Sequence, residues 1–476
     1  MTLQINNFEI KPKSYSPYKD SGIPWLSSVP THWEVLPNRS LFFEVIDRNH
    51  PYEEMLSVTI KKGVIKQNTL LSESSKKDSS NQDKTAYKLV QPGDIAYNKM
   101  RAWQGAIGIS EYRGIISPAY IVVRLRKNNN PRYFHYLFRT PAFSKEAERW
   151  SYGITSDQWS LRSEHFKMIY SVLPPFEEQT AIVRFLEHFD HLIKRFILAK
   201  QKQIKLLIEQ KQAIIHQSVT KGLNPNVKLK PSGVDWLGEI PNHWKVLPGR
   251  ICFREKKLSN NGLKNKTVLS LSYGRIIIKP EEKLHGLIPT SFETYQIIDK
   301  DDIIVRPTDL QNDHTSLRFG LSNEKGIITS AYICLNTLDL LTSEYGYYLL
   351  HTYDLIKIFY GLGSGLRQNL SWEDFKYLPC LIPPISEQNL IISFIKTSNN
   401  DIELQIEQLQ REITLLQEYR TSLIADVVTG KIDVREAVAH LPDEFKELEN
   451  IEEEDISLDD EVESSEMDVM DEEEVA

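Results

Sequence analysis

An internal duplication is the sequence feature that most constrains the fold of this 476-residue chain. Residues 22–42 read GIPWLSSVPTHWEVLPNRSLF and residues 233–253 read GVDWLGEIPNHWKVLPGRICF, so 11 of 21 positions are identical at an offset of 211. Three further blocks recur in the same order, namely residues 117–120 at 329–332, residues 173–179 at 382–388, and residues 219–222 at 428–431. A near-constant offset predicts two copies of one large unit, and the period is far too long for a solenoid repeat.

Each copy begins with a part that is rich in strand patterns. Short β-branched runs at residues 55–60 (MLSVTI) and 121–125 (IVVRL) are separated by Gly, Pro and Asn, which predicts strands and turns. The second copy has comparable runs at residues 275–278 (RIII) and 302–305 (DIIV). Helical patterns at residues 131–150 and 343–360 lie between such runs. We therefore predict a mixed α/β domain in each copy.

A long helix is predicted after each of these domains. Paired prolines at 174–175 and 383–384 end the preceding element, because proline fixes φ and restricts the residue before it. Ser386 is a candidate N-cap, and acidic Glu177, Glu178 and Glu387 suit the positive end of a helix dipole. Apolar residues then recur at spacings of four and three, as at Ile182, Leu186, Phe189, Ile193 and Phe196, and at Ile402, Ile406, Leu409, Ile413 and Leu416.

This apolar repeat is typical of a coiled-coil seam, and the duplicate helix is the obvious partner. Antiparallel pairing of the two helices would relate the halves by a pseudo-two-fold axis, which matches the approximate two-fold symmetry of duplex DNA. We therefore predict an α+β fold of five segments. They are a first mixed α/β domain (1–175), a first spacer helix (176–222), a second domain (223–384), a second spacer helix (385–430) and a C-terminal extension (431–476).

Charge is distributed unevenly along the chain. The formal net charge is −8, but residues 451–476 contain 14 Asp or Glu and no Lys or Arg, so residues 1–450 carry +6. The acidic run cannot bury enough apolar surface to offset the cost of ordering, which predicts a disordered tail. The mildly basic body is compatible with a nucleic-acid partner.

Composition also narrows the cellular setting. No stretch approaches the roughly 18 to 20 apolar residues that a membrane span needs, and residues 1–16 lack the apolar core of a signal peptide. The three cysteines, Cys252, Cys334 and Cys380, form neither a CxxC metal site nor a disulfide framework. We therefore expect a cytoplasmic protein.

Three duplicated motifs carry a resemblance to a known family. They are W-L-x-x-x-P-x-H-W-x-V-L-P at 25–37 and 236–248, [LI]-P-P-x-x-E-Q at 173–179 and 382–388, and V-T followed by Gly and Lys at 219–222 and 428–431. In combination they resemble the specificity subunits of type I restriction–modification systems, over residues 18–435. The acidic tail lies outside the resemblance.

The resemblance implies both a function and partners. It implies two target-recognition domains, each reading one half of a split DNA sequence, joined by two packed helical spacers. It also implies that two methyltransferase subunits and the restriction–translocase subunits bind this chain and direct methylation and restriction. S-adenosylmethionine, ATP and Mg would then serve those partners, with no cofactor site on this chain.

The residues themselves offer no constellation for catalysis by this chain. The glycine-rich run Gly361–Gly365 follows a helical pattern rather than a strand, which argues against a phosphate-binding loop. His32 and His243 lack a second ligand at zinc-site spacing, and beside Trp33 and Trp244 we interpret them as structural turns. We therefore expect a non-catalytic DNA-binding subunit. The alternative is a scaffold protein of a DNA-modifying complex without its own base readout.

Candidate DNA contacts lie on loops between the predicted strands. Lys and Arg meet phosphates, whereas Arg, Asn, Gln and Lys read base edges. The candidates are Lys62, Lys66, Lys99, Arg101, Gln104 and Gln158 in the first copy, and Arg275, Lys279, Arg306, Gln311, Asn312, Arg318, Arg367, Gln368 and Asn369 in the second. Any one of them could instead be a solvated surface residue. These loops differ between the copies while the framework matches, as two readers of different half-targets require.

Apolar residues beside the helical seam suggest a second kind of contact. A two-helix pair cannot cover all of them, so exposed apolar stripes would remain for methyltransferase subunits. The alternative is that they pack against the chain's own globular domains. The candidates are Phe185, Leu192, Ile197, Phe394 and Ile395.

Overall fold

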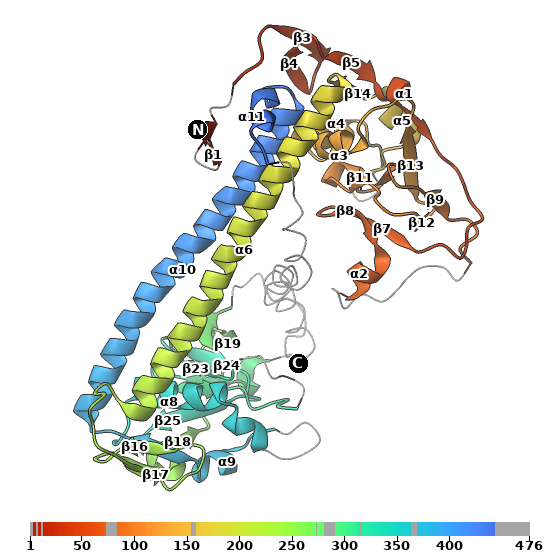
Figure 1. The fold of residues 1–476 in the computed structure, drawn as a ribbon. Coiled ribbons are helices and arrows are strands. Elements are labelled where there is room, and N and C mark those ends of the chain that lie inside the picture. Colours follow the sequence, from red (N-terminus) through yellow and green to blue (C-terminus); the bar gives the residue numbers. More distant parts are fainter. Residues whose placement is uncertain are drawn as a thin grey trace. The chain divides into compact units, whose positions relative to one another are not determined.

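The computed structural model of this chain divides into two compact units (Figure 1). Among the described residues, unit 1 contains those within 3–200 and 411–442, and unit 2 contains those within 201–410. The structure describes residues 3–5, 8–10, 13–72, 83–153, 159–272, 274–279, 291–311, 313, 317–362 and 369–442. The acidic tail that we predicted to be disordered lies outside these residues.

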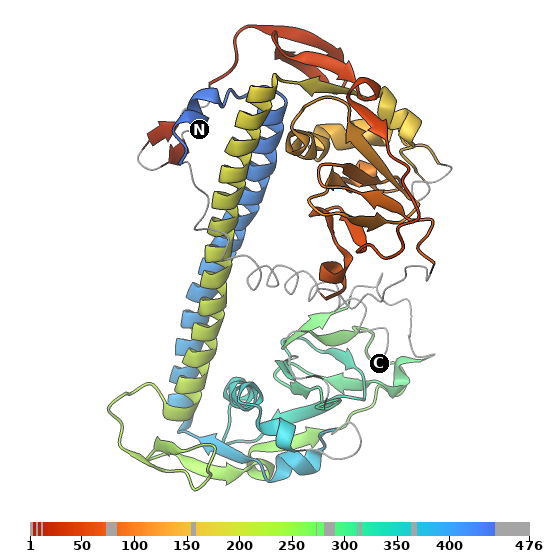
Figure 2. The ribbon, with the colours of Figure 1, turned by 45° about the vertical axis from the view of Figure 1, so that its right-hand side comes forward.

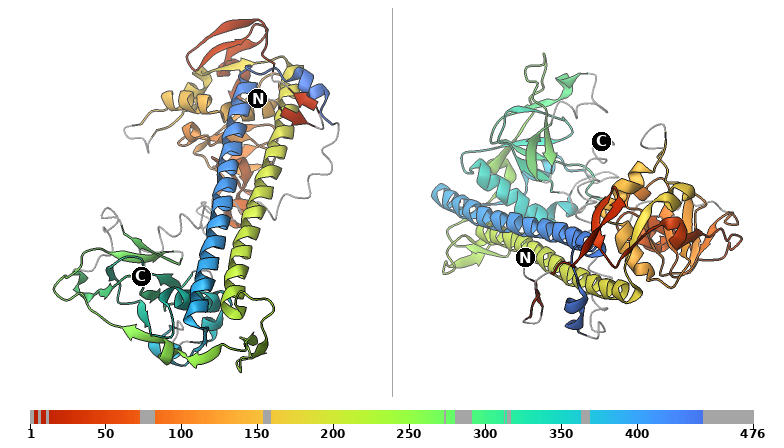
Figure 3. Two further views of the ribbon diagram at one scale, coloured as in Figure 1. Left: turned by 90° about the vertical axis from the view of Figure 1, so that its left-hand side faces the viewer. Right: turned by 90° about the horizontal axis from the view of Figure 1, so that it is seen from above.

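Two long helices contribute to both units and pair antiparallel within each. They are α6 (Phe176–Lys221) and α10 (Ile385–Val428), and both views in Figure 3 show them side by side. Residue numbers rise along α6 as they fall along α10. The interhelical ion pairs are Asp190–Arg420 and Lys200–Glu412 in unit 1, and Lys211–Glu403 in unit 2. The prediction of an antiparallel helix pair is confirmed.

The seam of this pair follows the predicted repeat with one correction. Ile193 and Ile197 are buried, whereas Phe196 is 58% exposed. An α-helix has 3.6 residues per turn, so a residue four positions after Ile193 stays on the seam, while Phe196 points away. Predicted seam residues in the middle of α10, such as Ile406 and Leu409, are half-buried.

A four-stranded antiparallel sheet forms the centre of the domain in unit 1. Its order is β11-β10-β13-β6, with β6 (Phe42–Glu44), β10 (Ile95–Asn98), β11 (Ile107–Ile109) and β13 (Tyr120–Leu125). Smaller pairs are β3 (Tyr18–Ile23) with β4 (Leu26–Pro30), β5 (Glu34–Pro37) with β14 (Tyr170–Leu173), β7 (Leu56–Thr59) with β8 (Gly63–Lys66), and β9 (Lys88–Val90) with β12 (Gly114–Ile116). The helices are α1 (Asn38–Leu41), α2 (Gln67–Ser72), α3 (Pro131–Phe138), α4 (Pro141–Arg149) and α5 (Ser163–Met168).

Unit 2 repeats this plan around a six-stranded sheet. Its order is β18-β25-β22-β23-β20-β19, with β18 (Phe253–Lys256), β19 (Leu269–Ser272), β20 (Arg275–Ile278), β22 (Ile303–Val305), β23 (Phe319–Leu321) and β25 (Ile333–Thr337). The pairs are β15 (Leu229–Pro231) with β16 (Glu239–Pro241), β17 (Lys245–Pro248) with β26 (Pro379–Ile382), and β21 (Gln296–Ile298) with β24 (Gly326–Ile328). Helix α8 (Ser343–Leu355) packs on the sheet (Figure 2), and α7 (Gly249–Cys252) and α9 (Trp372–Lys376) complete the domain.

The duplicated motifs meet at the start of each long helix. In unit 1 the buried indole of Trp33 donates from Nε1 to Glu178 Oε1 at 3.0 Å, and His32 Nε2 lies 2.8 Å from Glu178 Oε2. A buried carboxylate needs such partners, because an unpaired charge in the interior is costly. The motif that contains H-W therefore recurs together with the motif that supplies the glutamate.

The second copy repeats this arrangement inside unit 2. Trp244 Nε1 donates to Glu387 at 3.1 Å, and His243 Nε2 lies 2.7 Å from the same carboxylate. The following glutamine, Gln388, donates to the carbonyl oxygen of Pro383 at 3.0 Å and accepts from the backbone nitrogen of Thr342, the N-cap of α8, at 2.9 Å. The E-Q dipeptide thus joins the long helix to the domain that precedes it.

Each domain also contacts the end of the other long helix. The hydroxyl of Tyr133 on α3 donates to the carbonyl oxygen of Val428, at the end of α10, at 3.0 Å. The hydroxyl of Tyr345 on α8 donates to the carbonyl oxygen of Val219, near the end of α6, at 3.1 Å. Both tyrosines are fully buried. Each unit is therefore anchored on the start of one long helix and the end of the other.

Several predicted docking residues belong to the hydrophobic cores instead. Phe185 is 1% exposed in the core of unit 1, Ile395 is 0% exposed in the core of unit 2, and Ile197 is buried at the helical seam. Their prediction as partner contacts is wrong, because the chain's own domains and the second helix cover them. Leu192 is half-buried and Phe394 is 46% exposed, so both stay predictions. In the described part of the chain, no helix is long and apolar enough to cross a bilayer.

Candidate nucleic-acid interface

The first candidate site is loop 1, residues 99–106, which connects β10 to β11 in unit 1. The nitrogen of Asn98 donates to the carbonyl of Ala106 at 3.0 Å, and Ala106 donates back to the carbonyl of Arg101 at 3.1 Å. Gly105 closes the loop with a φ of 94°, which glycine adopts readily. These bonds hold the loop closed while Arg101 and Gln104 remain exposed.

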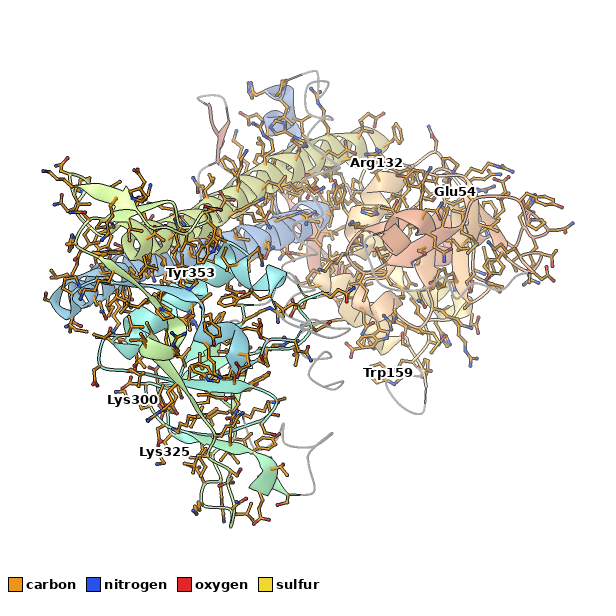
Figure 4. All side chains as sticks on the ribbon, turned by 90° about the horizontal axis from the view of Figure 1, so that it is seen from below. Glu54, Arg132, Trp159, Lys300, Lys325 and Tyr353 are labelled. Atoms are coloured by element: carbon orange, nitrogen blue, oxygen red, sulfur yellow. The ribbon has the colours of Figure 1, made fainter. Side chains whose placement is uncertain are left out.

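A second chain segment fastens loop 1 from the side. The nitrogen of Leu161 donates to the carbonyl of Lys99 at 2.8 Å, and Trp103 Nε1 donates to the carbonyl of Met100 at 3.0 Å. The Trp103 ring meets the ring of Trp159 edge-on, with centroids 5.7 Å apart. Figure 4 labels Trp159 at the edge of unit 1, where the described chain resumes after residues 154–158. The predicted contact Gln158 falls in that gap, outside the described residues.

The β7–β8 hairpin carries two further candidate DNA contacts of unit 1, Lys62 and Lys66. Lys62 is exposed on this turn. Lys66, at the end of β8, lies 3.1 Å from Glu54 Oε2 and 5.4 Å from the centroid of the Tyr112 ring. The ammonium of Lys66 therefore already has an acidic and an aromatic neighbour, whereas its role in binding phosphate stays a prediction.

Arg139, which was not predicted from the sequence, bonds both loop 1 and the β7–β8 turn. It follows α3, and its Nη1 donates to the carbonyls of Gly105 at 3.2 Å and Ile107 at 3.1 Å. Its Nη2 donates to the carbonyl of Ile60 at 2.7 Å and to that of Lys61. Burial lowers the pKa of Arg139 to about 10, which leaves it charged at neutral pH. One guanidinium thus joins loop 1 to the β7–β8 turn.

Loop 2, residues 306–318, connects β22 to β23 in unit 2 and occupies the corresponding place. The nitrogen of Leu370 donates to the carbonyl of Pro307 at 2.9 Å, which repeats the contact of Leu161 with loop 1. The side-chain oxygen of Asn369 accepts from the nitrogen of Asp309 at 3.1 Å. The structure therefore brings Asn369 to loop 2. The predicted contacts Asn312, Arg367 and Gln368 lie outside the described residues.

The prediction of Arg318 as a DNA contact is wrong. Its side chain is 0% exposed, and its guanidinium is bonded to the backbone of loop 2. The carbonyl acceptors are those of Thr308 and Asp313 at 2.6 Å each, Asp309 at 3.3 Å and Arg306 at 3.4 Å. A donor set occupied in this way has nothing left for a base or a phosphate. The sequence around Arg318 is that of an ordinary polar loop, so it does not distinguish a buried arginine from an exposed one.

The remaining candidates of unit 2 differ in their surroundings. Arg306 is half-buried, with Nη1 3.7 Å from Asp313 Oδ2. Arg275 is 74% exposed at its side chain, and its Nη2 lies 3.4 Å from Glu403 on α10. Lys279 is half-buried and Gln311 is exposed. These residues stay predicted DNA contacts, and Arg275 would have to leave Glu403 to reach a base.

Metal binding finds no support in the described ranges. No group of three or more His, Cys, Asp or Glu there is placed to hold an ion. The three cysteines, Cys252, Cys334 and Cys380, are all buried. The repeated histidines His32 and His243 instead bond the glutamates at the helix starts, as structural turns would.

Comparison with known proteins places this arrangement in a family. Residues 31–206 match the model of the type I restriction modification DNA specificity domain. The chain is 25% identical over 379 residues to the putative type I restriction enzyme MjaX specificity subunit of Methanocaldococcus jannaschii. This match covers 75% of this chain and 82% of that protein. A shorter match, 31% identical over 120 residues, covers 23% of this chain and 26% of the type I restriction enzyme MjaVIII specificity subunit of the same organism.

A solved structure shares the fold across most of the chain. It comes from work on complex assembly and conformational transition of the type I R-M system, with 13% identity and a TM-score of 0.60. The match covers 85% of this chain and 99% of the other. The internal duplication extends the motifs of the matched segment into the second half. Residues 31–206 therefore carry a type I restriction modification DNA specificity domain, and most of the chain is similar to type I restriction enzyme specificity subunits.

Proposed function

We propose that this chain reads a bipartite DNA target for a type I restriction–modification complex, with one half-target for each mixed α/β domain. Base recognition would come from loop 1 and loop 2. The chain would itself catalyse no reaction. Two methyltransferase subunits and restriction–translocase subunits would bind it and carry S-adenosylmethionine, ATP and Mg.

The observation that carries this proposal is the pairing of a common framework with unlike loops. The strand order around β10 and β22, the bond from Leu161 or Leu370 to the loop, and the anchoring glutamates recur in both units. Loop 1 exposes Arg101 and Gln104, whereas loop 2 exposes Gln311. Guanidinium and amide groups are those that recognise base edges in the major groove. Two frameworks with different loop chemistry fit two different half-targets.

Apolar residues that remain exposed on α10 support a protein partner on the long helices. Leu390, Phe394 and Leu404 are 63%, 46% and 64% exposed. Exposed apolar surface of this kind is a candidate site for binding another protein. We propose that methyltransferase subunits cover them in the complex.

The test is duplex binding by the complex of this chain with its methyltransferase partners. Selection from a library of randomised duplexes should yield two short conserved blocks separated by unspecified bases. Affinity for the selected duplex should fall steeply with salt, with a slope of about −0.9 per phosphate neutralised. A complex that assembles but selects no sequence, and binds all duplexes alike, would show that the chain is a scaffold without base readout.

A further inference from the structure

We propose that Arg139 and Arg318 are positioning residues for base recognition, each holding the recognition loop of its unit in one conformation. This inference rests on the proposed function and names residues that set its specificity without touching DNA. A base-reading side chain is useful only if its backbone is fixed, because loose geometry weakens directional hydrogen bonds. These guanidinium groups donate to backbone carbonyls of both loops, in addition to the backbone bonds described above.

We call each of these arginines the clamp of its loop. In unit 1 the clamp, Arg139, contacts loop 1 from the end of the neighbouring helix α3. Arg139 follows α3, and its two terminal nitrogens donate in two directions, toward loop 1 at Gly105 and toward the β7–β8 turn at Ile60. A guanidinium is planar with five N–H donors in a fixed fork, so both segments are held at one separation. Loop 1 and the turn that carries Lys62 therefore cannot shift independently.

In unit 2 the clamp lies inside the loop. Arg318 is the last residue of loop 2, and its fork turns back to the carbonyls of Thr308 and Asp313 at 2.6 Å each. Its Nε lies 3.3 Å from the hydroxyl oxygen of Tyr360, and its own backbone nitrogen donates to Asp354 Oδ2 at 3.0 Å. Four described residues of loop 2, Arg306, Thr308, Asp309 and Asp313, thereby direct their backbone carbonyls to one buried cation.

The clamping arginine stands at different aligned positions in the two copies. At the offset of 212 that aligns β11 with β23 and α3 with α8, Arg139 corresponds to His351, and Arg318 corresponds to Ala106. Each clamp thus serves one loop and has no counterpart in the other copy. The loops can therefore be disturbed one at a time, which makes the two halves of the target separately testable.

The experiment uses Arg139→Lys and Arg318→Lys in the complex with methyltransferase subunits. Lysine keeps the charge, but one ammonium cannot reach carbonyls in two directions. Duplexes from a randomised library are selected with each complex and sequenced. We expect Arg318→Lys to lower discrimination roughly tenfold in one half of the target, the loss expected when a base contact is misplaced. Arg139→Lys should do the same in the other half, and each variant should leave its opposite half unchanged.

Matched controls separate positioning from a general loss of structure. Arg132→Lys changes an exposed arginine on α3 that is ion-paired with Glu111 and Glu187 (Arg132 is labelled in Figure 4). Arg254→Lys changes an exposed arginine on β18 of unit 2. Both controls should keep the wild-type target. The inference is overturned if the folded Arg139 and Arg318 variants also keep it, or if each loses both halves equally.

Hydrogen exchange gives a second, independent measurement on the same variants. Arg139→Lys should speed amide exchange in residues 99–106, and unchanged exchange there would overturn the clamp in unit 1. If Arg318→Lys does not fold, Arg318→Gln replaces it in both measurements. A wild-type complex that selects no sequence refutes the proposed function, whereas a split target that both variants retain refutes only this inference.

Discussion

Glu178 accepts a hydrogen bond at 3.0 Å from the indole nitrogen of Trp33, although 145 residues separate the two in the chain. The same carboxylate lies 2.8 Å from His32 Nε2. This relationship joins the first strands of unit 1 to the first turn of α6, and Trp244 and Glu387 repeat it in unit 2. In each unit one carboxylate therefore helps to hold the domain on the start of its long helix.

Loss of that carboxylate should destabilise the protein. Glu178→Ala leaves the buried Trp33 nitrogen without its partner, at an expected cost of about 1–3 kcal/mol in the free energy of unfolding. Glu387→Ala should cost less, because the Glu387 side chain is 26% exposed and that of Glu178 only 5%. Urea titration measures both. Glu177→Ala, at an exposed neighbouring position, is the control and should change little. Equal stability of all three variants would contradict this account of the anchor.

Exposed loop residues should contribute to DNA binding in two distinct ways. Arg101→Ala in the assembled complex should cost about 1–3 kcal/mol of binding free energy and relax one target position, if Arg101 reads a base. Lys62→Ala should weaken binding to all duplexes alike and reduce the salt slope by about one phosphate. Titrations at several salt concentrations with matched and mismatched duplexes distinguish the two. Unchanged affinity and target would remove the residue concerned from the interface.

Two adjacent residues on α10 should behave oppositely. Ile395→Ala removes a core side chain of unit 2 and should cost about 2–5 kcal/mol of stability. Phe394→Ala should leave stability unchanged, since the side chain is 46% exposed, but should weaken binding of the methyltransferase subunits. Thermal melting and co-purification with the methyltransferase report these effects. Full retention of methyltransferase binding by Phe394→Ala would argue against docking at this surface.

Stability should depend on pH through His351. Burial lowers its pKa from 6.5 to about 4, so the unfolded chain takes up a proton at this residue before the folded chain does. Stability is then full above pH 6.5 and falls between pH 6.5 and about 4, by at most about 1.4 kcal/mol per pH unit for one group. His351→Phe retains an aromatic ring beside Tyr347 and should reduce this slope in chemical denaturation. An identical pH dependence in the variant would contradict the assignment.

The sequence predicts the framework of this protein because its signals are local or repeated. The four-and-three spacing of Ile182, Leu186 and Phe189 needs only the helical period to be interpreted, and the duplication supplies the partner helix. The same spacing cannot say which neighbour covers a residue. Phe185 and Ile395 look like an exposed stripe in sequence, and only the fold shows that the globular domains cover them.

The candidate interface is less predictable, because hydrogen bonds to backbone carbonyls leave no pattern in the sequence. Arg318 has the same local context as an exposed loop arginine, yet its acceptors are brought around it by the path of loop 2. Arg139 stands in the mostly apolar run YFHYLFRT, and a lone cation after such a helix was a usable signal. Its carbonyl partners at Ile60 and Gly105 lie in two other segments, which only the folded chain brings together.

The central claim is tested most directly by mapping methylated bases in the genome of cells that carry this gene, lack it, or carry it with Arg101→Ala. Two recognition units predict that a motif of two separated blocks is methylated in the first strain and unmethylated in the second. In the third strain, one block should be relaxed and the other retained. A methylation pattern that is the same in all three strains would contradict the claim that this chain reads DNA.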